Sequence, residues 1–561
     1  LFAGFGIGDT HQLANSITHG PDGSLWFTQG LHAFSRVETP WGLARLEKAG
    51  VWQLNPRTQH MEGYFNGGKA GHNCWGVAFD DFHQVFHKSG DRPDGYYTVP
   101  GLVSIPDPDE YHGVGSLFFT NPKTTSLDFI GTSALPEDIQ GCVVIGGYFG
   151  NVVELHRLLD DGAGFKSEQL PKLVRSNSTA FRPVDVSVGP DGAIYLADWF
   201  NPVIGHYQAS YADPRRDRTH GRIWRITAKG RAPVKPPQLA NLSAPQLLEQ
   251  LRSPERWTRY QAKRLLFDRP SPEVLAAADA WIAQLDPVAP DHERLLLEVC
   301  GLFQAHQAPR PALLAQLLAA KDARVRAYAA RVIGSWAKHL PNTLDLLTQA
   351  VRDANPRVRL EAVVAASHIA RPEAVAVALQ ALDAPRDRFI DYALSQVVKS
   401  LKPQWQPALA SGKLPLAKGS SHEAFLKSIA SAAPVREHPG KVIYDGLCLN
   451  CHQPSGGGLP GIYPSLIQSD WVNGDPSVLA KIIIHGLTGT ITVSGEPFTQ
   501  LAPIPMPPMG LDDQQTADVL TYIRSTFGNK APAVTAETVK AAREASAGRA
   551  TFWTAHELPA K

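Results

Sequence analysis

The sequence predicts a multidomain chain in which an all-β propeller is followed by an all-α solenoid and then by a small all-α domain. Three observations predict this order. Pro-Asp-Gly turns between short apolar strands recur in the first part, Ala-, Leu- and Arg-rich segments repeat with helical spacing in the middle, and a Cys-x-x-Cys-His motif lies between two helical segments near the end. We place the boundaries at residues 1–230, 236–432 and 437–529, with a tail at 530–561.

Size and charge exclude several classes of protein. A chain of 561 residues is too long for one hydrophobic core. The formal net charge of +1 gives no field that would attract nucleic acid or an anionic membrane, so neither partner is expected. No apolar run reaches the roughly 20 residues of a transmembrane helix.

The chain begins at Leu1 instead of an initiator Met, and we expect that processing removed a leader or that further residues precede it.

Short strands and tight turns repeat through residues 1–230. The run GPDGSLWF at residues 20–27 is matched by GPDGAIYL at residues 189–196, and weaker copies lie at residues 77–85 and 141–155. In each, a turn joins two short apolar strands. Strands that recur every roughly 40 to 60 residues are typical of propeller blades. We predict about four blades and expect residues before Leu1 to supply the others.

The segment 236–432 contains a helical repeat. Runs that begin at Ser253, Asp322 and Asn355 share a turn followed by Arg and by buried-type Val, Ala or Leu, and the last two begin 33 residues apart. The pattern resembles HEAT repeats, which stack into a solenoid. Such a solenoid is expected to act as a spacer or to bind a partner protein on its surface, and nothing in this segment predicts catalysis.

The run CLNCH at residues 448–452 is an attachment sequence for one covalent c-type haem. Two thiols at this spacing, Cys448 and Cys451, reach the two vinyl groups of one porphyrin edge, and His452 then lies under the iron as an axial ligand. The alternatives are a chance match or a zinc site. A zinc site needs further Cys or His ligands, and His485 is the only His that follows within this domain.

The flanks of this motif predict one helix at residues 440–444 and another at residues 517–524. The arrangement resembles class I cytochromes c, in which two such helices cross and a Met supplies the sixth iron ligand. The family pattern of Met followed by Pro favours Met506 as that ligand, and Met509 is the alternative. The predicted metal ligands are therefore His452 and Met506, a pair that raises the haem potential and suits an electron acceptor.

Other side chains of the same domain are assigned to the haem pocket. We expect Trp471, Ile482 and Leu487 to form its wall. We expect His485 to pack or to hydrogen-bond nearby.

A haem domain fused to a propeller suggests an internal electron acceptor for a dehydrogenase. The propeller resembles the glucose/sorbosone dehydrogenase family, whose members use pyrroloquinoline quinone (PQQ) and calcium. The domain order resembles multidomain propeller–HEAT–cytochrome c proteins of planctomycetes and verrucomicrobia. The resemblance is strongest at residues 181–226 and 440–524.

This resemblance implies a set of propeller residues. His11 would be the general base that removes a proton from the sugar, the alternative being a strand-end hydrogen-bond network. In the family's Arg-Asn motif, His72 replaces the Arg and Asn73 is kept. Arg182 would pair with a cofactor carboxylate, and oxygen ligands at residues 89–94 would hold Ca²⁺.

Two polar clusters follow the last strands of this region, at residues 198–202 and 213–222. The second contains four Arg and two Asp within ten residues. Such a run suits a polyanion or a sugar, or else forms a network of salt bridges that closes the propeller.

These observations predict a periplasmic or exported protein that oxidises a sugar or related alcohol with PQQ. Electrons would leave through its own haem to an external acceptor, a cytochrome or an oxidase. The alternative is a non-enzymatic electron carrier whose propeller and HEAT modules bind partner proteins or polysaccharide. The enzyme requires His11, Asn73, Arg182 and Asp198 to converge on one axial pocket.

Overall fold

The protein forms two compact units, Leu1–Ala432 and Ala433–Lys561, in a computed structural model. The structure describes residues 2–7, 13–31, 33–65, 67, 73–89, 94–105, 114–120, 124–203, 213–431, 438–453, 455–458, 463–498 and 505–558.

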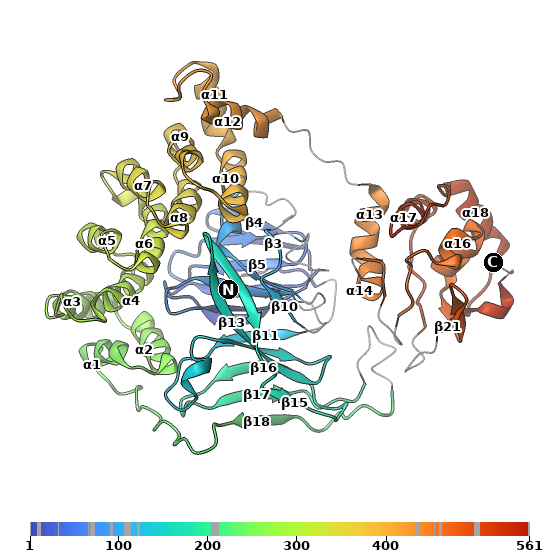
Figure 1. Cartoon of the computed structure of the whole chain (residues 1–561), viewed down its shortest axis with the longest axis horizontal. Coiled ribbons are helices and arrows are strands. Elements are labelled where there is room, and N and C mark those ends of the chain that lie inside the picture. Colours follow the sequence, from blue (N-terminus) through green and yellow to red (C-terminus); the bar gives the residue numbers. More distant parts are fainter. Residues whose placement is uncertain are drawn as a thin grey trace. The chain divides into compact units, whose positions relative to one another are not determined.

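Four antiparallel sheets make up the first part of the first unit (Figure 1). The first sheet contains β1 Asn15–His19, β2 Leu25–Gln29, β5 Gly50–Leu54 and β6 Met61–Tyr64, with the hairpin β3 Ser35–Thr39 and β4 Gly42–Leu46 beside it. The second contains β7 Cys74–Phe79, β8 Val85–Ser89, β9 Asp94–Tyr97 and β10 Phe118–Phe119. The third contains β11 Thr125–Phe129, β12 Val143–Gly147, β13 Val152–Asp161, β14 Gly164–Gln169 and β15 Val174–Arg175. The fourth contains β16 Pro183–Val188, β17 Ile194–Asp198 and β18 Arg222–Ile226.

The sheets follow one another as blades do. The first strand of each sheet contacts the first strand of the next, in the order β1, β7, β11, β16. Three of the four predicted turns lie between the first two strands of a sheet, and the copy at residues 141–155 instead joins the second and third strands, β12 and β13. Gly23 and Gly192 both take φ of +77° in their turns, a conformation that favours glycine. Four strand groups are therefore confirmed. A closed ring is not found: among the described strands no pairing joins the fourth sheet to the first.

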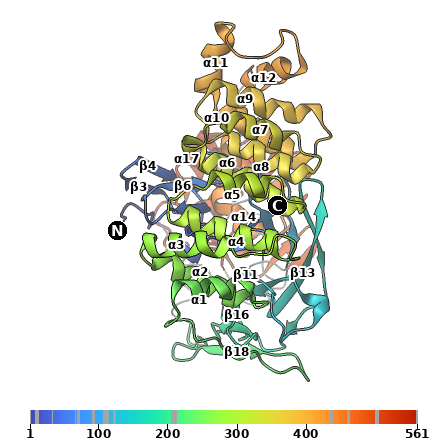
Figure 2. The same ribbon diagram turned by 90° about the vertical axis from the view of Figure 1, so that its left-hand side faces the viewer.

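Twelve helices follow the sheets within the described part of the first unit. They are α1 Ala244–Glu249, α2 Arg256–Asp268, α3 Ser271–Ile282, α4 His292–Ala305, α5 Pro311–Leu318, α6 Ala323–Ser335, α7 Thr343–Val351, α8 Pro356–Ala366, α9 Pro372–Ala378, α10 Arg388–Ser400, α11 Lys402–Ala410 and α12 Ser421–Ser431. Figure 2 faces this stack and shows the helices piled along the unit in chain order. The repeat predicted from the sequence is thus helical.

The repeat has a structural reason. The turn residue is an N-cap: the side chains of Asp322, Asn355 and Asp387 accept hydrogen bonds from backbone N–H groups at the starts of α6, α8 and α10. In three of the repeats, which begin at Ser253, Asp322 and Asn355, an Arg side chain donates to two carbonyls of the turn that precedes its helix. Arg259 donates to the carbonyls of residues 253 and 254, Arg326 to those of residues 320 and 321, and Arg359 to those of residues 353 and 354.

The solenoid packs against the turns of the sheets. The guanidinium of Arg357 donates to the carbonyl of Gly164 at 2.8 Å and to the carboxylate of Asp160 at 2.8 Å. A Cβ at Gly301 of α4 would lie 2.2 Å from the carbonyl oxygen of Pro21, so only glycine permits this approach. Because the helices cover the turns, the strand-rich and helical segments form one compact unit.

The second unit is built around a crossing of two helices. Its helices are α13 Pro439–Ile443, α14 Leu449–His452, α15 Asp470–Asn473, α16 Pro476–His485, α17 Asp513–Ser525 and α18 Ala536–Ala545, and its strands are β19 Leu487–Thr488, β20 Ile491–Val493, β21 Glu496–Phe498 and β22 Trp553–Thr554. At the α13–α17 crossing, a Cβ on Gly440 would lie 1.8 Å from the carbonyl oxygen of Asp518. The two predicted flanking helices are confirmed.

The tail packs within this unit. Helix α18 contacts α16 and α17, and its Val539 and Ala542 share a buried cluster with Leu479 and Leu520. Strand β22 pairs in parallel with β19. Among the described residues, no helix in either unit combines the length and apolarity needed to cross a bilayer.

Candidate haem site

The CLNCH residues lie on a continuous helical segment. A π-helical turn, Tyr444–Cys448, connects α13 to α14, on which Cys451 and His452 lie. The Cys448 side chain is buried and Cys451 is half-buried. Tyr444 is fully buried and donates a hydrogen bond to the carbonyl of Gln453 at 2.7 Å, which holds the end of the motif against the α13–α17 crossing.

His452 is oriented by one main-chain carbonyl. Its Nδ1 lies 3.0 Å from the carbonyl oxygen of Pro464. A carbonyl only accepts, so Nδ1 carries the proton and Nε2 keeps its lone pair. Burial lowers the pKa of His452, while the bond to Pro464 raises it. The imidazole is therefore held neutral with Nε2 free to bind a metal.

An apolar cavity adjoins His452 and Cys448. It encloses about 90 Å³ and opens on one side to solvent. Six of its apolar wall residues are Leu466, Val472, Leu479, Ile482, Leu487 and Leu520. Among the described residues, no Asp, Glu, Lys or Arg lines it. This lining suits a large apolar ring. The predicted wall residues Trp471, Ile482 and Leu487 all line the cavity.

Met506 also lines this cavity, and Met509 is not among its described wall residues. The backbone of Met506 exchanges two hydrogen bonds with Leu487, at 2.9 and 3.0 Å. Met509 instead donates its N–H to the carbonyl of Ile483. His485 bonds through Nε2 to the Ser546 hydroxyl at 2.9 Å, and it does not line the cavity in the described structure.

The structure disfavours a zinc site here. Within the described residues, no group of three or more His, Cys, Asp and Glu side chains could hold a metal ion. Zinc takes thiolate ligands, whereas burial raises the pKa of the Cys448 thiol to about 12. An apolar pocket of this kind fits a neutral thioether better than a thiolate.

Comparison with known families agrees with this geometry. The family model for cytochrome c matches residues 438–527. Residues 438–527 are a cytochrome c domain. The model for HEAT repeats matches residues 310–399, and a domain of unknown function, DUF7133, matches residues 1–111 and 119–230.

Known relatives are cytochrome subunits of dehydrogenases. The chain is 30% identical over 159 residues to the cytochrome c subunit of the quinone alcohol dehydrogenase of Gluconacetobacter polyoxogenes, covering 28% of this chain and 31% of the relative. It is 33% identical over 113 residues to the cytochrome subunit of fructose dehydrogenase from Gluconobacter japonicus, covering 18% and 22%. It is 37% identical over 111 residues to the cytochrome c subunit of gluconate 2-dehydrogenase from Pantoea cypripedii, covering 19% and 24%. The chain thus spans less than a third of the length of each relative.

Solved structures similar to the chain include glucose dehydrogenases. One, from Thermus thermophilus, is 18% identical with a TM-score of 0.26 over 39% of this chain and 67% of that chain. Another glucose dehydrogenase is 15% identical with a TM-score of 0.23 over 38% of this chain and 63% of that chain. Similarity at this low identity and TM-score does not assign an activity to this chain.

The predicted propeller residues are only partly visible. His11 and His72 lie outside the described residues, as does most of the predicted calcium segment. Asn73 is buried, forms a β-bridge with Gly30 and accepts a hydrogen bond from the Trp75 indole at 2.6 Å. Its amide oxygen therefore has a partner inside its own sheet.

Arg182 is buried and its guanidinium bonds to main-chain carbonyls. Nε donates to Asn201 at 2.9 Å, and Nη1 donates to Tyr148 at 2.9 Å and to Phe149 at 3.3 Å. Its backbone N–H donates to the carboxylate of Asp198 at 2.7 Å, and Asp198 also accepts from the Trp224 indole. Burial lowers the pKa of Arg182 to about 10. These contacts give Arg182 a structural role, and its pairing with a cofactor stays a prediction.

The Arg/Asp run at residues 213–222 forms local contacts. Arg215 pairs with Asp213 at 2.7 Å, and His220 pairs with Asp217 at 2.9 Å. The guanidinium of Arg222 lies over the ring of Phe200 at 3.3 Å. These ion pairs join residues two or three positions apart, and the described strands show no pairing that closes the sheets into a ring.

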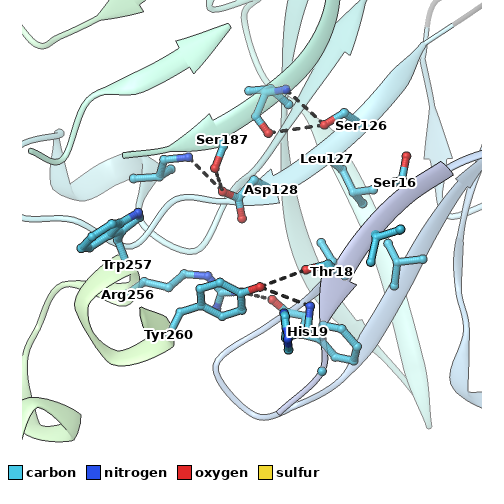
Figure 3. A pocket seen from close by; sticks show the side chains of 18 of the residues that line it. Ser16, Thr18, His19, Ser126, Leu127, Asp128, Ser187, Arg256, Trp257 and Tyr260 are labelled. Atoms are coloured by element: carbon cyan, nitrogen blue, oxygen red, sulfur yellow. Dashed lines mark hydrogen bonds between the residues drawn. The ribbon is translucent and has the colours of Figure 1, made fainter. Parts of the chain in front are cut away.

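A second cavity lies among the first strands of the four sheets and helix α2 (Figure 3). Tyr260 of α2 lies beside Thr18 and His19 of β1, and the Tyr260 hydroxyl accepts from the His19 N–H at 3.2 Å. Asp128 of β11 also lines it, and burial raises the pKa of this carboxyl. Neither Asn73, Arg182 nor Asp198 is among its described wall residues.

The sequence did not predict the residues that hold His452 and Met506 in place. Pro464 acts through a carbonyl that every residue type possesses, so its identity gave no indication. The tail was assigned no role, although Trp553 and Leu558 pack beside Met506. The sequence indication available was that Trp553 and Leu558 are large apolar residues in an otherwise polar terminal run, which is typical of residues that pack against a core.

Proposed function

We propose that this chain is an exported electron-transfer protein with one covalent haem c. Cys448 and Cys451 would form the thioethers, and His452 and Met506 would be the axial ligands. The observation that carries the proposal is the apolar cavity that His452 and Met506 both line beside the Cys448 thiol. A haem bound there would exchange single electrons with a partner.

The chain's own residues prepare this site. The Pro464 carbonyl keeps His452 in one tautomer. The apolar wall excludes water and lowers the local dielectric, which together with a thioether ligand stabilises the less charged, reduced metal centre. The site is thereby suited to accepting electrons from an organic donor.

The electrons would come from oxidation of a sugar or related alcohol. Support comes from the relatives, which by name are cytochrome subunits of alcohol, fructose and gluconate dehydrogenases. The electrons would then pass from the haem to an external acceptor, a cytochrome or an oxidase. Export is proposed because haem is attached to CLNCH motifs outside the cytoplasm.

The described geometry favours a carrier that works with a separate dehydrogenase. Arg182 already bonds to carbonyls, and Asn73, Arg182 and Asp198 do not line the cavity of Figure 3. In the carrier, the sheets and the HEAT surface would bind partner proteins or polysaccharide.

A PQQ- and Ca²⁺-dependent dehydrogenase within the same chain is the second candidate. The cavity of Figure 3 favours it, because Trp257 and Tyr260 beside the Asp128 carboxyl form the aromatic and polar lining that suits a sugar. His11 would act as its base.

Haem attachment is tested first. The purified chain is denatured and extracted with acidified acetone, and the haem absorbance of the protein pellet is measured. Haem that stays with the protein, and is lost in the Cys448→Ala/Cys451→Ala variant, supports the proposal. Haem that is extracted from the unsubstituted chain contradicts it.

The source of electrons is tested on the same holoprotein. It is titrated with PQQ and Ca²⁺, sugars and alcohols are added one by one, and haem reduction is followed by absorbance. Reduction that requires PQQ and disappears in His11→Ala supports the dehydrogenase. A haem that only dithionite reduces, with and without PQQ, supports the carrier.

A further inference from the structure

The C-terminal tail of the second unit lies against the strand that holds Met506. Strand β19 is only two residues long. On one side Leu487 pairs with Met506 through two hydrogen bonds of 2.9 and 3.0 Å. On the other side β22 of the tail pairs with β19 in parallel, and the N–H of Trp553 donates to the carbonyl of Gly486 at 3.1 Å. Met506 therefore belongs to a three-segment arrangement whose outer segment is the tail.

The approach of these segments is close at Gly486. This residue has φ of +80°, and a Cβ there would lie 2.3 Å from the carbonyl oxygen of Met506 and 2.6 Å from the ring of Phe552. The Met506 segment and the tail thus both contact the same glycine. Displacing the tail removes one side of the packing that fixes the position of the Met506 backbone.

Side chains of the tail reach the same place. Leu558 is 6% exposed and forms a buried cluster with Val478 and Ile482, against which Met506 and Trp553 pack. Ile482 is also a wall residue of the haem cavity. The tail therefore packs on the Met506 side chain and on the cavity wall together.

Arg549 holds this part of the tail in its conformation. Its guanidinium lies 3.6 Å from the centre of the Trp553 ring and donates to both carboxylate oxygens of Glu557, at 2.8 and 2.9 Å. It also donates to the carbonyls of Thr551 and Phe552, at 3.0 and 2.8 Å. One side chain thus connects the residues on both sides of β22.

A further contact is made where the Met506–Met509 segment ends. Arg543 of α18 donates to the carbonyl of Leu511 at 2.9 Å and to the carboxylate of Asp513 at 2.8 Å. The segment that carries both Met residues is therefore tied to the tail at its two ends.

We propose that the tail, residues 535–558, is a clamp that positions Met506 as the sixth haem ligand. The clamp rests on the proposed function, because it presupposes haem c and Met506 ligation. Arg549, Trp553 and Leu558 are positioning residues: they act through the backbone of Met506 and the cavity wall, and none of them is assigned contact with the iron. Weakening the clamp leaves haem attachment intact and makes the sulfur ligand easier to displace.

The test uses the full-length holoprotein with Arg549→Gln as the primary variant. Imidazole is titrated into the ferric protein, and loss of the far-red sulfur-to-iron charge-transfer band is followed. We expect apparent imidazole affinity to rise about fivefold to thirtyfold, the factor that corresponds to about 1–2 kcal/mol. The reduction potential is expected to fall as the population with sulfur bound decreases. Leu558→Ala is a second variant that keeps every tail hydrogen bond.

Lys540→Gln is the matched control, since Lys540 is an exposed residue of α18 in the same tail. The clamp is overturned if Arg549→Gln and Leu558→Ala bind imidazole and keep the charge-transfer band as Lys540→Gln does. Far-UV circular dichroism separates this failure from a failure to fold, because all three variants are expected to keep the helical signal of the unsubstituted protein.

The assignment of Met506 is tested separately. Met506→Ala must abolish the charge-transfer band. If the band survives in Met506→Ala, the ligand assignment fails and the clamp fails with it. If the band is lost in Met506→Ala and unaffected in the tail variants, the clamp alone is wrong.

Discussion

At the scale of single residues, the haem site depends on side chains whose surroundings restrict them to one role. Burial raises the pKa of the Cys448 thiol to about 12. The carbonyl of Pro464 fixes the tautomer of His452. Met506 and Met509 are close in sequence, but only Met506 is held by pairing with β19 and lines the cavity in the described structure.

Met506 and Met509 provide a matched pair of substitutions. We expect Met506→Ala to lose the far-red charge-transfer band of ferric haem and to lower the reduction potential, because a thioether ligand raises it. Met509→Ala should keep the band, since Met509 is not among the described wall residues of the cavity. The absorbance spectrum and a redox titration check both. The opposite pattern would assign the ligand to Met509.

His83 gives the first unit a pH dependence. It is 3% exposed, both ring nitrogens lack hydrogen-bond partners among the described residues, and its Nε2 lies 3.6 Å from the Glu298 carboxylate. Burial, and then Lys263, lower its pKa to about 4. The unfolded chain, with a pKa of about 6.5, binds more protons between these values. Stability is therefore lost as pH falls from about 6.5 towards 4, by about 2 kcal/mol at pH about 5.

This prediction is measured by urea unfolding at neutral and mildly acidic pH. His83→Gln should lose less stability on acidification than the unsubstituted chain, by about 2 kcal/mol. Burial raises the pKa of Asp80 to about 6, so protonation of this carboxyl favours the folded state as pH falls. This contribution is the same in the unsubstituted chain and in His83→Gln, and it cancels when the two are compared. An equal pH dependence of the unsubstituted chain and of His83→Gln would show that His83 binds a proton as readily in the folded as in the unfolded state.

At the scale of elements, local hydrogen bonds and close approaches determine which helices form and how they cross. The N-caps Asp322, Asn355 and Asp387 begin alternate solenoid helices, α6, α8 and α10. Repeated Arg side chains then connect each helix to its own turn. These contacts lie within a few residues in sequence, which is why the repeat was predictable.

Arg359 tests the importance of this helix-to-turn contact. It is 5% exposed and donates to the carbonyls of residues 353, 354 and 385. Arg359→Ala leaves these carbonyls without their donor and opens a cavity, so we expect the free energy of unfolding of the first unit to fall by about 2–3 kcal/mol. Arg352→Ala, which removes a single exposed contact to Gln380, is the control and should change it by less than about 1 kcal/mol. Denaturant unfolding measures both, and equal losses would contradict the prediction.

The α13–α17 crossing allows no side chain at Gly440. Its Cβ would lie 1.8 Å from the Asp518 carbonyl oxygen, so Gly440→Ala must separate the two helices. We expect a loss of about 1–3 kcal/mol in the second unit. Lys540→Ala is the control, because Lys540 is exposed in the same unit and surface substitutions change the free energy of unfolding by less than about 0.5 kcal/mol. Chemical unfolding followed by haem absorbance is the measurement, and similar effects of the two substitutions would refute the crossing.

At the scale of the whole molecule, the chain forms two compact units, the first of which includes both predicted regions 1–230 and 236–432. The solenoid covers the turns of the sheets, and a buried network connects Arg331, Glu361 and Gln84 across this boundary. The tail belongs to the cytochrome c domain. The two units are therefore expected to unfold independently.

Glu361→Ala tests this independence. Glu361 is fully buried and its removal leaves Arg331 without its carboxylate, so the first unit should lose about 3–5 kcal/mol. Haem absorbance, which reports the second unit, should show an unchanged midpoint while far-UV circular dichroism shows a shifted one. If both signals shift together, the units unfold as one.

Much of the fold and of the haem site followed from contiguous residues. The CLNCH spacing, the Pro-Asp-Gly turns and the helical repeat each depend on residues a few positions apart, so their geometry is determined by covalent distances and local hydrogen bonds. Helix α18 of the tail depends on a local contact in the same way, because the Thr535 side chain accepts from the backbone N–H of Thr538 at its start.

Only the tertiary structure decided the rest. Arg182 was assigned to a cofactor, but its donors are directed to carbonyls of Tyr148 and Asn201, which folding brings beside it. The pairing of Arg357 with Gly164 joins residues 193 positions apart, and the contact of the tail with the Met506 strand likewise joins distant segments. By itself the sequence determined which chemistry the chain carries and which local elements form. Which polar groups stay available for a ligand, and which segments hold Met506 in place, depended on packing between distant segments, because burial and hydrogen-bond partners exist only after the chain has folded.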